Sequence, residues 1–387
     1  MRITVAIPTI VGRIKYLEST LRTCVAQNYD NLEIIVSDNS PGGALEVVQS
    51  FKDERIRYIR PDYYLPMSAH WDFMTSHFTG DMVTIIGDDD GLMPGALHRV
   101  SEIVRSHGQK PIQHTLVNYC WSDFPEAESR DKFWFIHSPG STLAIRRSKD
   151  YLMDLCQAKA RYIDGPMIYH NFIPNELLKR LRINSSIFHR SSPDVYSSIT
   201  IAAHTDAFIE TKEVLTMSGQ GARANGAAVR DGGADGKRFI TEMQSTEYFS
   251  RYRSLTVQLQ TLDSILEASE RYSKPELKDW IDYGEHFCGA ANECLDMPVR
   301  SRAARQMALV AWEATKSGCL QYLIRNRGAK FLAKIGQAHR GHPVISDQTV
   351  EECGFNTGVK YEVSNEVTDI YSATIHVHQL LKRDCKP

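Results

Sequence analysis

The sequence predicts an α/β protein in which a mostly parallel sheet is flanked by helices and followed by a helical C-terminal domain. Two observations lead to this expectation. Over the first 110 residues, short apolar runs alternate with segments whose apolar residues recur at helical spacing, whereas from residue 239 onward only the helical spacing remains. Because crossovers between successive strands are right-handed, the alternating part forms a parallel sheet with helices on both faces.

The predicted elements of this first part follow one another closely. Strands are expected at residues 3–8, 32–37, 56–59 and 82–86, and helices at 14–28, 44–51, 68–78 and from 94 onward. The carboxyl ends of parallel strands lie at one edge of the sheet, so the polar residues after each strand are expected to converge on one crevice.

Composition excludes several classes of protein. The 387 residues are 42% hydrophobic and 24% charged with a net charge of -2, which is typical of a globular protein and gives no basic excess for nucleic acid. No apolar run approaches the roughly 18 residues that span a bilayer. The chain opens directly on a strand-like run, so we expect a cytoplasmic protein without a signal peptide. The eight cysteines form no C-x-x-C pair, which argues against a zinc site and a disulfide framework.

Three adjacent carboxylates, Asp88, Asp89 and Asp90, end the fourth apolar run. Their mutual repulsion must be offset, and a divalent cation with a preference for hard oxygen ligands would do so. A solvated acidic turn is the alternative. The chain has no G-x-G-x-x-G motif after the first strand and no P-loop motif, which argues against a dinucleotide cofactor and a P-loop enzyme.

Three motifs occur in a fixed order in this part of the chain. The first is A-I-P-T at residues 6–9 with Arg13, the second is C-V-A-Q-N-Y at 24–29 leading to L-E-I-I-V-S-D-N-S at 32–40, and the third is residues 79–94 around the aspartates. With these motifs, residues 3–100 resemble the nucleotide-binding half of a family-2 glycosyltransferase of the GT-A fold. The resemblance covers about a quarter of the chain.

The resemblance implies that the aspartates act as a D-x-D motif, holding Mn²⁺ or Mg²⁺ against the diphosphate of a nucleotide-sugar donor, with a UDP-sugar favoured. Because successive residues alternate in direction, not all three face the ion. We expect the metal on Asp89 and Asp90, and Asp88 nearer the ribose or sugar. The residues expected to bind the nucleotide are Pro8, Thr9, Arg13, Asp38, His70 and Asp88.

Two of these positions carry open questions. Asp38 stands where the family places a carboxylate against an imino N–H of the base; its alternative role is to cap a turn with the next residues. His70 precedes Trp71 where related enzymes often carry asparagine before tryptophan, which leaves the donor sugar open.

An inverting transferase also needs a general base for the acceptor hydroxyl. The family implies an Asp or Glu, usually in a Glu-Asp pair, about a hundred residues after the metal motif, and no such pair occurs here. We assign Asp194 as the base, with a helix N-cap as its alternative role. Asp164 is the reserve candidate, and His189, Arg190 and His204 are expected near the same site.

The chain is expected to divide into five parts: a nucleotide-sugar-binding part (1–110), an acceptor-binding part (111–218), a glycine-rich loop (219–237), a helical domain (238–342) and a segment of unknown role (343–387). The loop either closes over the donor or simply links domains. Residues 298–342 hold nine Lys or Arg and one acid. This basic stretch suits peripheral contact with the inner face of a membrane, a solvated face, or a contact between subunits of a homo-oligomer.

The expected function is metal-dependent, inverting, single-step transfer of a sugar to an acceptor hydroxyl, in surface glycan or glycolipid biosynthesis. The Q-x-x-R-W motif of processive synthases is absent. One alternative is a sugar nucleotidyltransferase, although the glycine-rich loop typical of that class does not follow the first strand. The other is a non-catalytic scaffold that binds nucleotide without transferring sugar.

Overall fold

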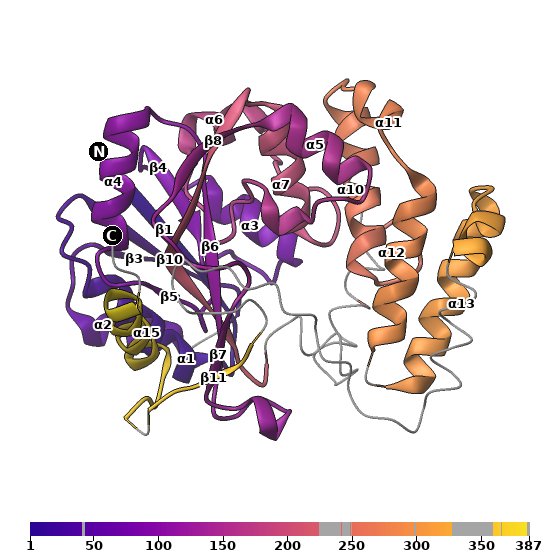
Figure 1. The fold of residues 1–387 in the computed structure, drawn as a ribbon. Helices are drawn as coiled ribbons and strands as arrows, with labels where there is room; N and C mark the ends of the chain where they lie inside the picture. The colour runs from indigo at the N-terminus through magenta and orange to yellow at the C-terminus, as the bar shows by residue number, and fades with distance from the viewer. Residues whose placement is uncertain are drawn as a thin grey trace.

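The computed structural model describes residues 1–40, 43–223, 241, 248, 250–297, 299–326, 359–364 and 366–384. They form an α/β part built on two sheets and a helical part that follows it (Figure 1). The predicted fold class is therefore confirmed. Among these residues, no helix is both long and apolar enough to cross a bilayer.

The first sheet is the one that the sequence predicts. Its strands, in spatial order, are β3 (Ile56–Ile59), β2 (Leu32–Asp38), β1 (Ile3–Thr9), β4 (Met82–Ile85) and β9 (Ile173–Pro174). The first four are parallel, and only β9 runs antiparallel to its neighbour. The β1–β2 register places Thr9 opposite Asp38, so the ends of these strands lie side by side.

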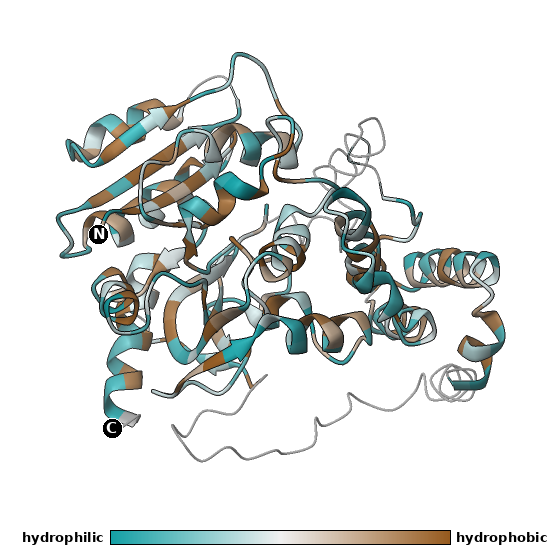
Figure 2. Ribbon diagram, turned by 90° about the horizontal axis from the view of Figure 1, so that it is seen from above, coloured by the Kyte–Doolittle hydropathy of each residue, from teal (hydrophilic) through white to brown (hydrophobic). Residues whose placement is uncertain are grey.

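Helices cover both faces of this sheet because its strands are apolar on both faces. Val5 and Ile7 of β1 pack in one core with α1 (Ile14–Val25), while Ala6 packs in a second core with α3 (Met67–Thr75). This division follows from the two-residue period of a strand. Two more helices, α2 (Ala44–Phe51) and α4 (Ala96–His107), join the first core. Figure 2 shows hydrophobic positions concentrated in the strands, whereas the helices carry both colours.

The second sheet is mixed. It is built from β11 (Tyr361–Glu362), β7 (Lys132–Phe135), β6 (Ile112–Cys120), β10 (Ala207–Gln220) and β5 (Gly91–Leu92), with β8 (Leu143–Arg147) paired to β10. The sequence does not predict β10, although it is 14 residues long. Its pairing with β6 shifts register twice, between Thr211 and Val214 and between Val214 and Met217. These irregularities interrupt the alternation by which a strand is recognised.

The helical part confirms the expectation for the region after residue 239. Its main helices are α10 (Val257–Arg271), α12 (Tyr283–Asp296) and α13 (Arg300–Lys316). α10 contributes Ile265 and Ala268 to a core shared with α7 (Pro193–Ala203), and Leu259 and Leu262 to a core shared with α12. The helical region continues in α13 to Lys316 and again at residues 320–326, beyond which residues 327–342 lie outside the described residues.

The last helix, α15 (Ile370–Asp384), returns to the α/β part and lies beside α1 (Figure 1). Ile370, Ala373 and Val377 are buried in the same core as α1. The preceding Asp369 accepts a hydrogen bond from Ser19 Oγ at 2.9 Å. The C-terminal segment, for which the sequence predicts no role, therefore supports the helix that follows the first strand.

Candidate active site

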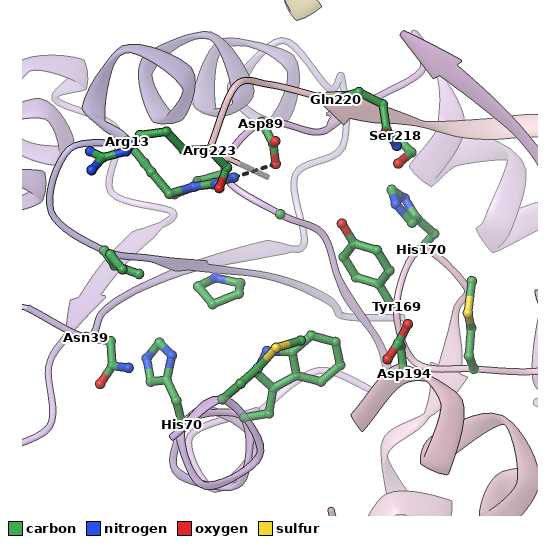
Figure 3. Close-up of a pocket in the computed structure, with 18 of the residues that line it drawn as sticks. Arg13, Asn39, His70, Asp89, Tyr169, His170, Asp194, Ser218, Gln220 and Arg223 are labelled. Carbon is green, nitrogen blue, oxygen red and sulfur yellow. Dashed lines mark hydrogen bonds and ion pairs between the residues drawn. The ribbon is translucent and has the colours of Figure 1, made fainter. Parts of the chain in front are cut away.

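A pocket of about 420 Å³ opens at the carboxyl ends of β1, β2 and β4 (Figure 3). The first sheet and α3 supply one side, and the segment 162–170, the start of α7 and the end of β10 supply the other. The polar and aromatic residues that line it are Arg13, Asn39, Tyr64, His70, Trp71, Asp88, Asp89, Asn118, Tyr162, Tyr169, His170, Asp194, Ser218, Gln220 and Arg223. The predicted convergence of strand ends on one crevice is confirmed, and it brings together residues more than a hundred positions apart.

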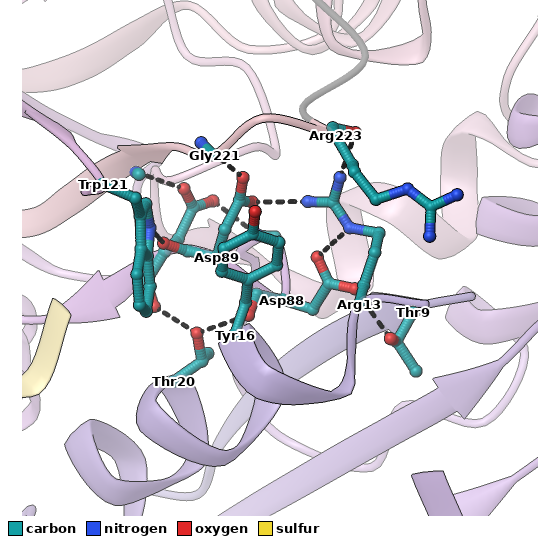
Figure 4. Close-up of polar contacts among 12 residues, drawn as sticks. Thr9, Arg13, Tyr16, Thr20, Asp88, Asp89, Trp121, Gly221 and Arg223 are labelled. Atoms are coloured by element: carbon teal, nitrogen blue, oxygen red, sulfur yellow. Dashed lines mark hydrogen bonds and ion pairs between the residues drawn. The ribbon is translucent and has the colours of Figure 1, made fainter. Parts of the chain in front are cut away.

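The aspartate cluster, defined as Asp88, Asp89 and Asp90, follows β4, and two of its members line the pocket. Asp88 accepts hydrogen bonds from Thr9 Oγ1 at 2.7 Å and from Arg13 Nε at 2.6 Å. Arg13 Nη2 lies 2.9 Å from Asp89 Oδ1, so one guanidinium bridges both carboxylates (Figure 4). The Arg13 side chain is only 13% exposed, so this ion pair is largely shielded from solvent.

Asp90 has a different environment from its two neighbours. It is fully buried and does not line the pocket. Its Oδ2 accepts from the Tyr169 hydroxyl at 2.6 Å and from the Gly87 N–H, and its Oδ1 accepts from the Gly219 N–H at 2.7 Å. A metal ion at Asp90 would have to displace these donors, so the geometry favours Asp89 over Asp90 as the ligand.

Burial dominates the electrostatics of the cluster. It raises the pKa of Asp88 and of Asp89 to about 6, and the repulsion between adjacent carboxylates acts in the same direction, while the charge of Arg13 opposes the rise. Burial also works to lower the pKa of Arg13, but the charges of Asp88 and Asp89 outweigh it and raise that pKa. One guanidinium thus faces two buried carboxylates and offsets only part of their negative charge. The site can therefore accept more positive charge.

The cluster offers one carboxylate oxygen that a divalent cation could bind. Among the described residues, Asp89 Oδ2 accepts a long hydrogen bond, 3.4 Å from the Gly221 N–H, so this hard oxygen at the pocket wall is weakly engaged. Across the described ranges, no three His, Cys, Asp or Glu side chains gather into a ready metal site.

The backbone of the cluster is fixed by side chains from other elements. Thr20 Oγ1 of α1 donates to the carbonyl oxygens of Asp88 and Asp90, at 2.8 and 2.6 Å. Trp121 Nε1, just after β6, donates to the Asp89 carbonyl at 3.0 Å. The turn that carries the carboxylates is thus held by a helix packed on the first sheet and by the end of a strand of the second sheet.

The end of β10 closes against the same turn. A Cβ atom on Gly219 would lie 1.7 Å from the Asp89 carbonyl oxygen, so only glycine permits this approach. Two residues later the Gly221 N–H reaches Asp89, and the Ala222 N–H donates to Asp123 Oδ1 at 3.3 Å. These residues begin the predicted glycine-rich loop 219–237, of which residues 224–237 lie outside the described residues.

Four of the predicted nucleotide-binding residues line the pocket: Pro8, Arg13, His70 and Asp88. Thr9 does not line it and instead supports Asp88. The His70 ring bonds Ser37 Oγ through Nε2 at 2.8 Å, and burial lowers the pKa of His70 to about 4. His70 is therefore neutral near pH 7 and cannot pair with a phosphate as a cation.

Asp38 lies just outside the pocket. It is buried, and its carboxylate accepts from the Ser40 N–H at 3.1 Å and from the Tyr58 hydroxyl at 3.0 Å. The bond from Ser40 is that of a turn cap, and the bond from Tyr58 ties Asp38 to β3. Its neighbour Asn39 lines the pocket, and the amide of Asn39 holds the backbone of Leu65 in two hydrogen bonds.

Asp194 lies in the first turn of α7 and lines the pocket. Burial raises its pKa above the usual value of 3.8, while a hydrogen bond from the Tyr162 hydroxyl acts to lower it. The reserve candidate Asp164 does not line the pocket. Burial acts to raise its pKa, but His137 and Arg161 outweigh it and lower the pKa to about 2, which makes Asp164 a weak base.

The other residues expected near the base lie elsewhere. Arg190 forms ion pairs with Asp263 and Glu267 of α10. The rings of His189 and His204 pack against tyrosines, and none of the three lines the pocket.

Tyr169 and His170 are pocket residues that the sequence analysis missed. His170 is 1% exposed, bonds Thr216 Oγ1 through Nδ1 at 2.9 Å, and has Nε2 3.4 Å from Asp90 Oδ2. Burial lowers the pKa of His170 to about 3, so it is neutral. The local sequence signal for these two residues was a short apolar run after Gly165 and Pro166. In the structure, Tyr169 of this run pairs with Ile85 of β4 through an isolated β-bridge.

The Gly219→Ala variant tests the closure of β10 on the cluster. The added methyl group would displace the strand end, and we expect the free energy of unfolding to fall by roughly 1–3 kcal/mol, typical of overpacking. Chemical denaturation measures this. Gly289→Ala is the control, because the new Cβ atom would meet the Gln258 side chain rather than backbone. Equal stability of the two variants would contradict the interpretation.

Comparison with known proteins finds a family whose model matches part of this chain. The family model of glycosyl transferase family 2 matches residues 4–163. The chain is 34% identical over 100 residues to the GalNAc(5)-diNAcBac-PP-undecaprenol beta-1,3-glucosyltransferase of Campylobacter jejuni, a match over 25% of this chain and 32% of that protein. The chain thus spans about a third of the length of the curated relative it matches.

The solved structures that are similar to this chain share little sequence with it. S. aureus TarS 1-349 in complex with UDP-GlcNAc gives a TM-score of 0.47 at 12% identity, covering 88% of this chain and 93% of that one. The mannosyltransferase PcManGT from Pyrobaculum calidifontis, in complex with GDP-Man and Mn2+, gives 0.39 at 16% identity, covering 87% and 88%. The match to the model of glycosyl transferase family 2 thus covers residues 4–163 of the 387 residues.

Proposed function

We propose that this protein transfers a sugar from a nucleoside-diphosphate sugar to an acceptor hydroxyl. The observation that carries the proposal is one pocket in which Asp88 and Asp89 line one side and Asp194 the other, within a chain that has a family-2 domain. These two acidic sites have different partners and therefore suit different steps. The first suits cation-assisted binding of a diphosphate, and the second suits proton abstraction.

The donor is proposed to bind with its diphosphate at Arg13, Asp89 and Arg223, and with its nucleoside along Pro8 and Asn39. As the glycosidic bond to phosphate breaks, negative charge develops on the leaving diphosphate. The arginines stabilise that charge directly in a partly dehydrated pocket. When bound on Asp89, Mn²⁺ or Mg²⁺ would supply further positive charge to the same oxygens.

The acceptor is proposed to enter on the side of Asp194. Its hydroxyl would give a proton to the Asp194 carboxylate as its oxygen attacks the anomeric carbon and the diphosphate departs. A single displacement of this kind inverts the configuration at that carbon. The Tyr162 hydroxyl, bonded to Asp194, orients the carboxylate and favours its charged form.

The acceptor is proposed to be lipid-linked, with one sugar added per binding event. The Campylobacter jejuni relative is named for an acceptor that carries PP-undecaprenol. In this chain, α13 presents Trp312, 58% exposed, together with exposed Arg305 and Lys316, at a spacing that puts all three on one face. A tryptophan among basic residues suits the interface of an anionic membrane.

The donor site is tested by thermal denaturation with UDP, GDP, dTDP and CDP, each with and without Mn²⁺. We expect one nucleotide to stabilise the protein in the presence of Mn²⁺, by about 2.7 kcal/mol at a hundred times its dissociation constant. Asp89→Asn should abolish the metal-dependent part, whereas Asp154→Asn on α5 (Ser148–Cys156) should retain it. If no nucleotide stabilises the wild type at millimolar concentration, the donor site is not as proposed.

The base is tested by the pH dependence of transfer. Asp194→Asn should lower kcat by roughly 10²–10⁴-fold, the usual contribution of a general base. The Tyr162 hydrogen bond lowers the pKa of Asp194, so Tyr162→Phe should raise that pKa and move the acidic limb of kcat/KM to higher pH. Tyr119→Phe is the matched control, because Tyr119 donates to Asp131 outside the pocket.

In that experiment, an unchanged acidic limb in Tyr162→Phe would contradict the assignment of Asp194. Binding of nucleotide without transfer or hydrolysis of any nucleotide sugar would instead favour the non-catalytic scaffold. Formation of a nucleotide sugar from a sugar phosphate and a nucleoside triphosphate would favour the nucleotidyltransferase.

The membrane surface is tested by sedimentation with vesicles. We expect binding to phosphatidylglycerol vesicles and none to phosphatidylcholine vesicles. Arg305→Gln should weaken binding about fivefold, which corresponds to roughly 1 kcal/mol for one basic residue, and Trp312→Ala should weaken it further. Arg147→Gln, at an arginine 78% exposed beside α5, is the control. Equal loss in the control would argue against a specific role for α13.

A further inference from the structure

We propose that Arg13 is a displaceable counter-ion of the aspartate cluster. In the absence of substrate its guanidinium occupies the place of the divalent cation. The diphosphate of the donor then draws it away, so that metal and nucleotide bind cooperatively. This inference rests on the proposed function, because it requires a nucleoside diphosphate and a divalent cation in the pocket.

All three guanidinium nitrogens of Arg13 have partners, and two of these partners belong to the aspartate cluster (Figure 4). Nε lies 2.6 Å from Asp88 Oδ1, Nη2 lies 2.9 Å from Asp89 Oδ1, and Nη1 donates to the Arg223 carbonyl oxygen. The acceptors come from two distant parts of the chain. Arg13 is therefore held as a bound cation would be, by oxygens from several directions.

Arg13 and a metal ion on Asp89 compete for the same carboxylate. The ion would bind Oδ2 of a group whose Oδ1 already lies 2.9 Å from Arg13 Nη2. Asp88 and Asp89 are 2% and 4% exposed, so solvent poorly screens the repulsion between the guanidinium and a second cation there. The charge of Arg13 therefore opposes binding of the metal alone.

A diphosphate gives Arg13 an alternative partner. The planar guanidinium binds phosphate oxygens bidentately, and Arg13 itself lines the pocket in which the diphosphate is proposed to lie. Arg13 is the residue before α1, and rotation about its own side-chain bonds can move the guanidinium without moving the helix. Once Arg13 pairs with phosphate, the two carboxylates lose their counter-ion and attract the metal.

Thermodynamic linkage makes this effect reciprocal. If the nucleotide raises the affinity for metal by removing Arg13, the metal raises the affinity for nucleotide by the same factor. Without Arg13, the carboxylates would attract the metal whether or not nucleotide is present. Arg13 alone thus couples the binding of the two ligands. Its replacement should reduce this coupling.

The test is the binding of Mn²⁺ followed by electron paramagnetic resonance of the free ion, with and without UDP or GDP, corrected for Mn²⁺ bound by the nucleotide alone. For the wild type we expect weak binding of Mn²⁺ alone and at least tenfold tighter binding with nucleotide. Arg13→Gln should bind Mn²⁺ alone at least tenfold more tightly than the wild type and lose most of the nucleotide effect. Arg13→Lys keeps the charge and should bind Mn²⁺ alone weakly.

Lys15→Gln is the matched control, because it removes a positive charge two residues away that pairs with Asp123 rather than with the cluster. It should behave as the wild type. The inference is overturned if Arg13→Gln binds Mn²⁺ no more tightly than the wild type, if Lys15→Gln reproduces its effect, or if nucleotide leaves the affinity of the wild type for Mn²⁺ unchanged. If the wild type binds neither Mn²⁺ nor nucleotide, the proposed function itself fails.

Discussion

Three adjacent carboxylates at the end of a buried strand set the main constraint on this structure. Asp88, Asp89 and Asp90 are each less than 5% exposed, and charges buried to this degree must be hydrogen-bonded or paired. Each therefore receives donors from other elements: Thr9 at the end of β1, Arg13 before α1, Tyr169 in the segment 162–170, and the backbone at the end of β10. The same contacts join the two sheets, so the cost of burying the charge is offset by bonds that also fix the pocket.

This constraint explains features remote from the pocket. α1 carries Thr20, which holds the backbone of the cluster, and α15 packs on α1 with Asp369 accepting from Ser19. Gly219 must lack a side chain because the strand end approaches a backbone carbonyl, not because a turn requires positive φ. Both α15 and Gly219 thereby help to fix the position of the carboxylates.

The parts that could be predicted from sequence are those with local signals. β1 to β4 and their helices show clear apolar periodicity, and α2 and β3 have the predicted limits. Asp88 and Asp89 could be located because three adjacent aspartates end a strand. The role of Asp90 could not be predicted, because its partners Tyr169 and Gly219 lie 79 and 129 residues away. β10 was missed because its register shifts break the alternation.

The carboxylates in and near the pocket differ in their bonding partners, and this difference is the strongest physical ground for assigning them different roles. Asp88 and Asp89 share a guanidinium, and Asp164 is held by Arg161 and His137, so each of these carboxylates already has a cationic or ring-nitrogen partner. Asp194 instead accepts from neutral donors, backbone N–H groups and the Tyr162 hydroxyl, and burial raises its pKa. A carboxylate held by neutral donors can accept a proton without first losing an ion pair. The pocket therefore separates acidic groups suited to hold positive charge from one suited to take a proton, which is the division that sugar transfer to a hydroxyl requires.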